Sequence, residues 1–210
     1  MTATSLAGPY DRLYSASPDN ILWDSTPSHL MLKLNGLLAT GNVLDAGCGD
    51  GVNALFLERS GYSVRGLDVS KLALNGLRIR FGSEHVQPVG RYSQADLHHW
   101  RGDGVRYNAL VSCGLFQCLS KETRHIVHSR LQSFLTEEGI VLFSCLTNTI
   151  PLPQNHQTPG LELADVSEVR DLFSGMRIEY FREGVIEDRH GTIVDRHEHS
   201  VVWVVARGAT

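Results

Sequence analysis

The segment 43–51, which reads VLDAGCGDG, constrains the fold of this chain more than any other part of it. A short apolar run with one carboxylate leads directly into three glycines at every second position, Gly47, Gly49 and Gly51. Glycine adopts backbone conformations that other residues avoid, and it lets a ligand or a helix approach the bare backbone. The pattern therefore predicts a strand, a tight loop around a bulky ligand, and a helix that begins at the loop.

Segments that suit strands alternate with segments of helical spacing along most of the chain. After the first strand, the sequence predicts strands over 62–68, 89–95, 107–113 and 140–146, and helices over 51–60, 70–81 and 120–135. After a proline-rich loop it predicts a helix over 164–174, a strand over 176–184, a turn near Gly191 and a last strand over 198–206. Such alternation forms βαβ units and hence a parallel sheet. We expect a Rossmann-like α/β fold, with a seven-stranded, mostly parallel sheet, helices on both faces and the last strand antiparallel.

The length of the chain fits one domain. Its 210 residues, 42% of them hydrophobic, are enough to bury a substantial core. We expect a single domain over 1–210 with an N-terminal lid over 1–40, a ligand-binding core over 41–147, and a substrate-side loop and hairpin over 148–210. The first twenty residues are rich in turn formers, which predicts that they lie over the surface.

Composition argues against several classes of protein. The formal net charge is −4 and the 19 basic residues are scattered, so we expect no nucleic-acid partner. No apolar run reaches the roughly 20 residues of a membrane span. The N-terminal residues lack the basic and apolar regions of a signal peptide, so we expect a cytoplasmic protein without a membrane partner. The four cysteines form no CxxC pair, which predicts free thiols and no metal site.

Asp45 indicates the charge of the ligand that the loop would hold. A dinucleotide fingerprint reads GxGxxG and brings a pyrophosphate to the helix N-terminus. Here the spacing is GxGxG, and Asp45 stands two residues before the first glycine. A carboxylate repels a pyrophosphate by about 1 kcal/mol or more, whereas it attracts a cation. S-adenosylmethionine (SAM) carries an ammonium and a sulfonium, so this segment favours SAM as the cofactor.

The ends of the next three strands carry residues that suit a nucleoside. Asp68, with Val69 beside it, follows the glycines by about 20 residues and is placed to bind ribose hydroxyls, as in dinucleotide and SAM sites alike. Asp96 can accept the adenine amino group, with Leu97 against the ring. Cys113 ends the fourth strand, where we expect the backbone to pass the adenosine or methionine portion.

In order and spacing these motifs resemble the class I SAM-dependent methyltransferases across about 40–146. More narrowly, the segments YDRLY, TPSHLM and GDGVNALFLERSGYSVRGLDVS, together with the final hairpin, look like the tellurite-resistance methyltransferase family of the TehB type. This resemblance implies methyl transfer from SAM to a small, soft acceptor such as a metalloid or chalcogen oxyanion (tellurite or selenite). Small members of the fold occur as a monomer or a homodimer, and we expect one of these states here.

The resemblance also implies an acceptor site on the last hairpin. The hairpin arginines of the family match Arg189 and Arg196, and its histidine falls on Asp188 or, with a shifted hairpin, on His190. His29 lies in a segment that we expect to fold over the cofactor, which makes it a candidate base or anchor. The alternative for the hairpin residues is that they are simply hydrated, and the alternative for His29 is that it belongs to a helix-capping cluster. Close by, Tyr10, Tyr14 and Trp23 are candidates for the pocket wall.

Two other classes remain open at this point. An NAD(P)-dependent oxidoreductase would need the GxGxxG spacing that the chain lacks. A SAM-binding protein that transfers no methyl group would carry the same glycine loop. Within the methyltransferases, transfer to an oxygen, nitrogen or sulfur of a small metabolite is an alternative to an oxyanion acceptor.

Overall fold

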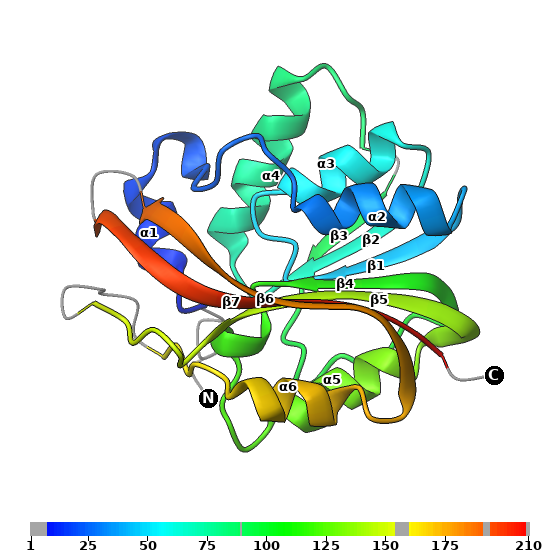
Figure 1. The fold of residues 1–210 in the computed structure, drawn as a ribbon. Helices are drawn as coiled ribbons and strands as arrows, with labels where there is room; N and C mark the ends of the chain where they lie inside the picture. The colour runs from blue at the N-terminus through cyan, green and yellow to red at the C-terminus, as the bar shows by residue number, and fades with distance from the viewer. Residues whose placement is uncertain (1–7, 89, 154–159, 191–193, 209–210) are drawn as a thin grey trace, which may run out of the picture.

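A seven-stranded sheet in the order β3-β2-β1-β4-β5-β7-β6 forms the centre of the protein. The structure is a computed structural model that describes residues 8–88, 90–153, 160–190 and 194–208 (Figure 1). The strands are β1 Asn42–Ala46, β2 Ser63–Asp68, β3 Arg91–Gln94, β4 Tyr107–Cys113, β5 Leu135–Thr147, β6 Met176–His190 and β7 Val194–Gly208. Strands β1 to β5 pair in parallel, and β7 runs antiparallel to both β5 and β6. The predicted seven-stranded sheet with an antiparallel last strand is therefore confirmed.

Helices cover both faces of this sheet. Figure 1 shows α2, α3 and α4 on one face and α5 and α6 on the other. Their bounds are α1 Asp11–Ala16, α2 His29–Leu37, α3 Val52–Arg59, α4 Lys71–Ser83, α5 Arg124–Gln132 and α6 Val166–Leu172, with short 3-10 turns η1 Pro18–Asn20 and η2 Phe116–Cys118. Successive residues of a strand point to opposite faces, so Val43 packs under α2, α3 and α4 while Leu44 packs under α5 and α6. Both faces of β1 are thus buried, as expected for a central parallel strand.

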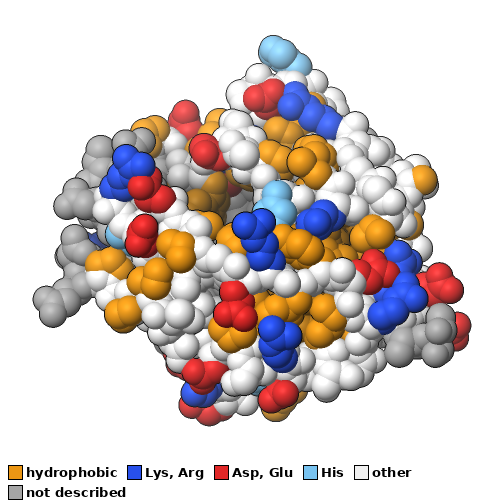
Figure 2. All heavy atoms as spheres, viewed as in Figure 1, with side chains coloured by type: hydrophobic (Ala, Val, Ile, Leu, Met, Phe, Trp, Pro, Cys, Tyr) orange, Lys and Arg blue, Asp and Glu red, His pale blue; other side chains and the backbone are white. Residues whose placement is uncertain are grey.

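The C-terminal half departs from the predicted bounds in length. Strand β5 begins at Leu135, where its partner is Tyr107, and the expected helix over 120–135 shrinks to α5. Strands β6 and β7 are each 15 residues long, so the hairpin extends well beyond the predicted 176–184 and 198–206. Charged residues continue the ladder, as Glu187 and Glu198 do, because an edge hairpin can place them in water. Figure 2 shows Lys, Arg, Asp and Glu side chains scattered over the viewed face of the molecule. The turn predicted near Gly191 lies outside the described residues.

The N-terminal segment contains a helix that the sequence did not suggest. We expected surface turns over the first twenty residues, but α1 buries Leu13 and Tyr14. The prediction was wrong for this part because two side chains at neighbouring helical positions are enough to attach a six-residue helix to the domain. No helix among the described residues is both long and apolar enough to cross a membrane.

Candidate active site

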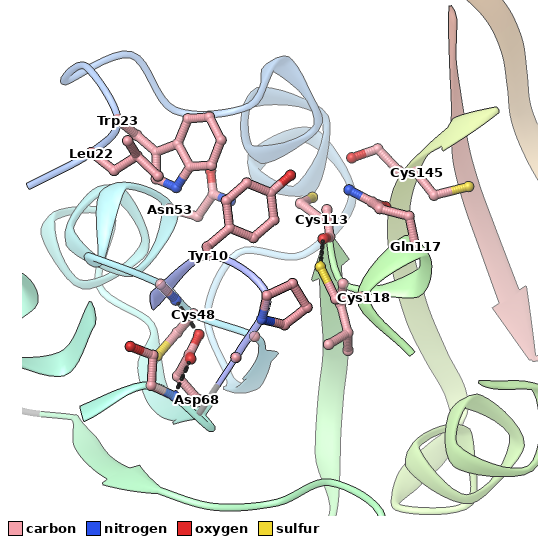
Figure 3. A pocket seen from close by; sticks show the side chains of 18 of the residues that line it. Tyr10, Leu22, Trp23, Cys48, Asn53, Asp68, Cys113, Gln117, Cys118 and Cys145 are labelled. Atoms are coloured by element: carbon pink, nitrogen blue, oxygen red, sulfur yellow. Dashed lines mark hydrogen bonds between the residues drawn. The ribbon is translucent and has the colours of Figure 1, made fainter. Parts of the chain in front are cut away.

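A cavity of about 1380 Å³ opens where the parallel strands of the sheet end (Figure 3). Its wall is formed by residues 8–28 of the N-terminal segment, the glycine loop, the ends of β2, β4 and β5, and the hairpin β6–β7. Ligand cavities of single small molecules usually measure about 300–1000 Å³. The cavity therefore has room for a cofactor and a second molecule beside it.

The glycine loop folds as the sequence predicted, with all three glycines at positive φ. The values are +75° for Gly47, +55° for Gly49 and +84° for Gly51, a region that L side chains rarely adopt. A Cβ at Gly49 would lie 2.8 Å from the Tyr14 hydroxyl, inside the cavity wall. A Cβ at Gly51 would lie 2.7 Å from Leu77 of α4, and Gly51 is not part of the wall. Gly51, predicted as a cofactor contact, thus serves the packing of α3 against α4.

Asp68 holds the glycine loop to the end of β2. Its Oδ2 accepts a hydrogen bond of 2.8 Å from the backbone N–H of Gly49, and its Oδ1 accepts one of 2.8 Å from Ser70. Each carboxylate oxygen can accept a second bond, and both Asp68 and Val69 line the cavity. Burial raises the pKa of Asp68 to about 6 despite these hydrogen bonds. The group is therefore mostly ionised at neutral pH and available to a hydroxyl-bearing ligand.

Asp45 lies behind the loop and not in the cavity wall. Its side chain is only 2% exposed, and its Oδ2 has no hydrogen-bond partner within the described part of the chain. Burial, and then the nearby Asp68 carboxylate, raise the pKa of Asp45 to about 7. The expected direct contact between Asp45 and a cationic ligand is therefore not the arrangement that the structure shows. What remains is a buried carboxyl group, about half ionised at neutral pH, whose charged form would act on a ligand through the loop.

At the end of β3, Asp96 and Leu97 line the cavity as predicted, but Asp96 is tied to a histidine that the sequence analysis did not single out. Asp96 Oδ1 accepts hydrogen bonds from the backbone N–H of His98 at 2.8 Å and from its Nδ1 at 2.9 Å. His98 Nε2 lies 3.0 Å from Thr123 Oγ1. Although burial raises it, these bonds hold the pKa of Asp96 below its ordinary value. The other oxygen, Oδ2, lies 3.7 Å from His99 Nε2 and is the one that can meet a ligand amino group.

Cys113 is the last residue of β4 and lines the cavity. Its thiol hydrogen-bonds with the side chains of Ser144 and Ser28, and burial raises its pKa to about 12, so it stays protonated. All four cysteines are free. Among the described residues, no three His, Cys, Asp or Glu side chains gather as a metal site would require.

The predicted acceptor-side residues do not all converge on the cavity. His29 lies outside the wall, where its ring packs edge-on against Trp203 at 5.3 Å and Tyr180 at 6.3 Å between centroids. Burial, then Lys33 and Arg182, lower its pKa. The ring thus packs beside the hairpin, and the role of His29 as a base or anchor stays a prediction. Arg196 does line the cavity, and it forms an ion pair with Glu187. The side chains of Arg189 and His190 lie outside the described residues.

The N-terminal aromatic residues do wall the cavity, as predicted. Tyr10, Tyr14 and Trp23 all face it, and Trp23 Nε1 donates to the Tyr14 hydroxyl at 3.2 Å. The sequence analysis missed the pair that holds this segment in place, Asp50 and Arg80, both almost completely buried and 3.0 Å apart. The signal that could have revealed the pair is an arginine on the apolar face of helix α4, where only a partnered cation is tolerated.

Comparison with known proteins gives a methyltransferase match for the glycine-loop half. Residues 43–139 match a family model described as "Methyltransferase domain". A curated protein of Mycobacteroides abscessus, 2-heptyl-1-hydroxyquinolin-4(1H)-one methyltransferase, is 28% identical over 124 residues, or 59% of this chain and 54% of that protein. The chain spans about half the length of the curated relatives that it matches.

Solved structures share the fold over most of the chain. TehB from Haemophilus influenzae has a TM-score of 0.72 at 19% identity, covering 85% of this chain and 61% of TehB. The N-methyltransferase NodS from Bradyrhizobium japonicum, solved with S-adenosyl-L-homocysteine (SAH), has a TM-score of 0.71 at 13% identity and covers 97% of this chain and 100% of NodS. At these identities the likeness concerns the fold.

Proposed function

Because residues 43–139 match a methyltransferase-domain family model, we propose that the protein transfers the methyl group of SAM to a small-molecule acceptor. The observation that carries the proposal is the Asp68 carboxylate, which is bonded to Gly49 and Ser70 and faces the cavity beside the glycine loop. An acid at the end of the second strand suits ribose hydroxyls. The glycines leave the backbone bare where a bulky cofactor would press against it.

The residues of the wall divide into roles that fit the cofactor. Asp68 would hold the ribose, Asp96 Oδ2 the adenine amino group, and Leu97 and Val69 the faces of the ring. Asp45 would favour the cationic cofactor from behind the loop, since an ionised carboxylate in low-dielectric surroundings attracts a sulfonium strongly. When bound, SAM supplies a methyl group activated by its sulfonium, so the chain needs only to align the acceptor and exclude water.

The acceptor is the part of the proposal that the relatives leave open. The relative from Mycobacteroides abscessus is named for a hydroxyquinolone, a flat ring system. The sequence segments that resemble the tellurite-resistance family support the narrower proposal of a tellurite- or selenite-like oxyanion. The described wall contains one arginine, Arg196, and its charge is already paired with Glu187. A cavity of about 1380 Å³ also exceeds what SAM and a single oxyanion would fill. We therefore favour a larger organic acceptor.

Calorimetric titration with SAM, SAH and NAD(P)H tests the cofactor. We expect SAM and SAH to bind and NAD(P)H not to bind; tight NAD(P)H binding would overturn the proposal in favour of an oxidoreductase. Incubation with methyl-labelled SAM and a panel of hydroxylated aromatics, thiols, tellurite and selenite then tests transfer. SAM binding without label transfer to any acceptor would support a binding protein that does not transfer methyl groups.

The remaining expectations about partners follow from the same proposal. A small-molecule acceptor fits a chain with a net charge of −4 better than a nucleic acid does. We also propose a cytoplasmic monomer or homodimer. Light scattering of the purified protein and fractionation of its host cells would test the two points.

A further inference from the structure

Gln117 is a buried amide at the acceptor end of the cavity that the cofactor roles above do not use. It lies in the turn η2 directly after β4, lines the cavity and is only 3% exposed. Its Oε1 accepts the backbone N–H of Leu146 at 3.4 Å, and its own carbonyl accepts the N–H of Glu162 at 2.8 Å. Two segments far away in sequence therefore fix both the backbone and the side chain of this residue.

The orientation of the amide follows from its bond to β5. A backbone N–H can only donate, so the oxygen of the Gln117 amide must face Leu146 and the NH₂ group must face the other way. Its Nε2 would lie 3.7 Å from a Cβ placed on Gly114, another residue of the wall. Figure 3 shows this nitrogen pointing into the space beside Cys113. Within the described part of the chain, Nε2 has no hydrogen-bond partner.

The NH₂ group of Gln117 opens onto the cavity, where a ligand oxygen can accept its hydrogen bond. A ligand that fills this place without such an oxygen would leave the donor unsatisfied, at a cost of about 1–3 kcal/mol. Leu146 lies at the amide itself, and Leu119, Val201 and Trp203 add further apolar side chains to the same wall. In Figure 3 this end is separated from Asp68 and Cys48, where the cofactor roles gather. A ligand here would have an apolar body and one oxygen aimed at Gln117.

We propose that Gln117 determines acceptor specificity, by donating a hydrogen bond to a carbonyl or ionised hydroxyl oxygen of a flat, apolar acceptor. This inference rests on the proposed function, because this compartment takes the acceptor only if the glycine-loop end holds the cofactor. A donor facing the cavity selects an oxygen that accepts, and a neutral hydroxyl would also need a partner for its own proton. Glu187 of the hairpin could accept such a proton, but its carboxylate is already paired with Arg196.

A pair of ligands that differ by one oxygen tests the inference. The protein saturated with SAH is titrated calorimetrically with 4-nitrophenol, which is ionised in mildly alkaline buffer, and with nitrobenzene. Both ligands carry the nitro group, but nitrobenzene lacks the phenolate oxygen. We expect the wild type to bind the phenolate at least about tenfold more tightly, the gain typical of a hydrogen bond to a charged group. In Gln117→Leu this preference should fall to about unity, with the affinities for nitrobenzene and SAH unchanged.

Two further variants and the SAH titration distinguish a failure of the Gln117 inference from a failure of the proposed function. Gln117→Glu keeps an oxygen for the Leu146 N–H but places a negative charge in the cavity, so it should bind the phenolate more weakly than Gln117→Leu does. Gln132→Leu is the matched control, since that side chain contacts Met176 outside the cavity, and it should keep the full preference. An unchanged preference in Gln117→Leu, or a loss of SAH affinity instead, would overturn the inference while the proposed function stands. Failure of SAH to bind the wild type would overturn the proposed function itself.

Discussion

The two ends of the cavity are built in different ways. At the cofactor end, the key contacts lie within adjacent βα units, such as the bond between Asp68 and Gly49. At the acceptor end, Gln117, Leu146 and Trp203 come from three segments that lie far apart in the sequence. The cofactor end thus depends on local backbone geometry, and the acceptor end depends on topology. This difference means that the acceptor end can change through loops and hairpin without disturbing the loop that would hold SAM.

One buried ion pair attaches the N-terminal segment to the cofactor end of the cavity. Asp50 belongs to the glycine loop, and its Oδ2 accepts the backbone N–H groups of Leu22 at 2.8 Å and Trp23 at 3.0 Å. Arg80 of α4 donates to the carbonyl of Asp50 at 2.9 Å and to that of Trp23 at 2.8 Å. The N-terminal segment is therefore attached to the cofactor loop by its backbone, and its aromatic side chains are held over the cavity.

The largest effect is expected from breaking this attachment with Arg80→Met. The variant leaves Asp50 as a buried carboxylate without its cation, which typically costs about 3–5 kcal/mol. Urea denaturation should show that loss. Arg78→Met on the exposed side of the same helix, whose guanidinium bonds Leu74 and Asn75 within that helix, should change stability by less than about 0.5 kcal/mol. The double variant Arg80→Met with Asp50→Asn should lose less stability than Arg80→Met alone, because it no longer buries an unpaired carboxylate. Equal losses in the single and the double variant would contradict the role of the unpaired Asp50 charge.

Asp45→Asn tests the charge buried behind the loop through the pH dependence of stability. The folded pKa of Asp45, about 7, lies above its ordinary value, so folding disfavours ionisation. The stabilisation is therefore complete below the unfolded pKa of about 4 and is lost as pH rises through about 7. In the ligand-free protein the free energy of unfolding should fall between about pH 4 and pH 8, by about 2–4 kcal/mol more in the wild type than in Asp45→Asn. Parallel pH profiles in urea denaturation would show that Asp45 is not the group responsible.

The contrast between the two ends also explains what the sequence could predict. The glycine loop and Asp68 follow local rules of φ and strand order, so their places could be inferred from spacing alone. Gln117 and Arg80 carry no such rule, because their roles come from contacts with Leu146 and Trp23 that only the folded chain creates. The place of the His29 ring beside the hairpin could not be inferred for the same reason. A helix turns its side chains through all directions, and a shift of one position moves a ring from the cavity to the packing side.

Asp68→Asn addresses the cofactor end with an intermediate effect. Asparagine offers one acceptor oxygen in place of two, so the bond to either Gly49 or Ser70 is lost together with the charge. We expect SAM and SAH to bind about 10- to 100-fold more weakly by calorimetry, in line with bonds to a charged group. The acceptor-end variant Gln117→Leu is the matched comparison and should leave SAH affinity unchanged. Equal weakening by both variants would mean that the two ends are not separate sites.

The smallest effect is expected from Arg196→Gln, and it decides between the two acceptor proposals. Arg196 and Glu187 are exposed to 74% and 50%, so their ion pair contributes less than about 1 kcal/mol to stability. If the acceptor is a flat organic molecule anchored by Gln117, the KM for the acceptor should change by less than about threefold, because rim charges contribute little to affinity. A tellurite- or selenite-like acceptor would instead depend on the guanidinium fork, and its KM should rise about tenfold or more. Glu187→Gln frees that fork and should lower the KM of an oxyanion while leaving that of a flat acceptor unchanged.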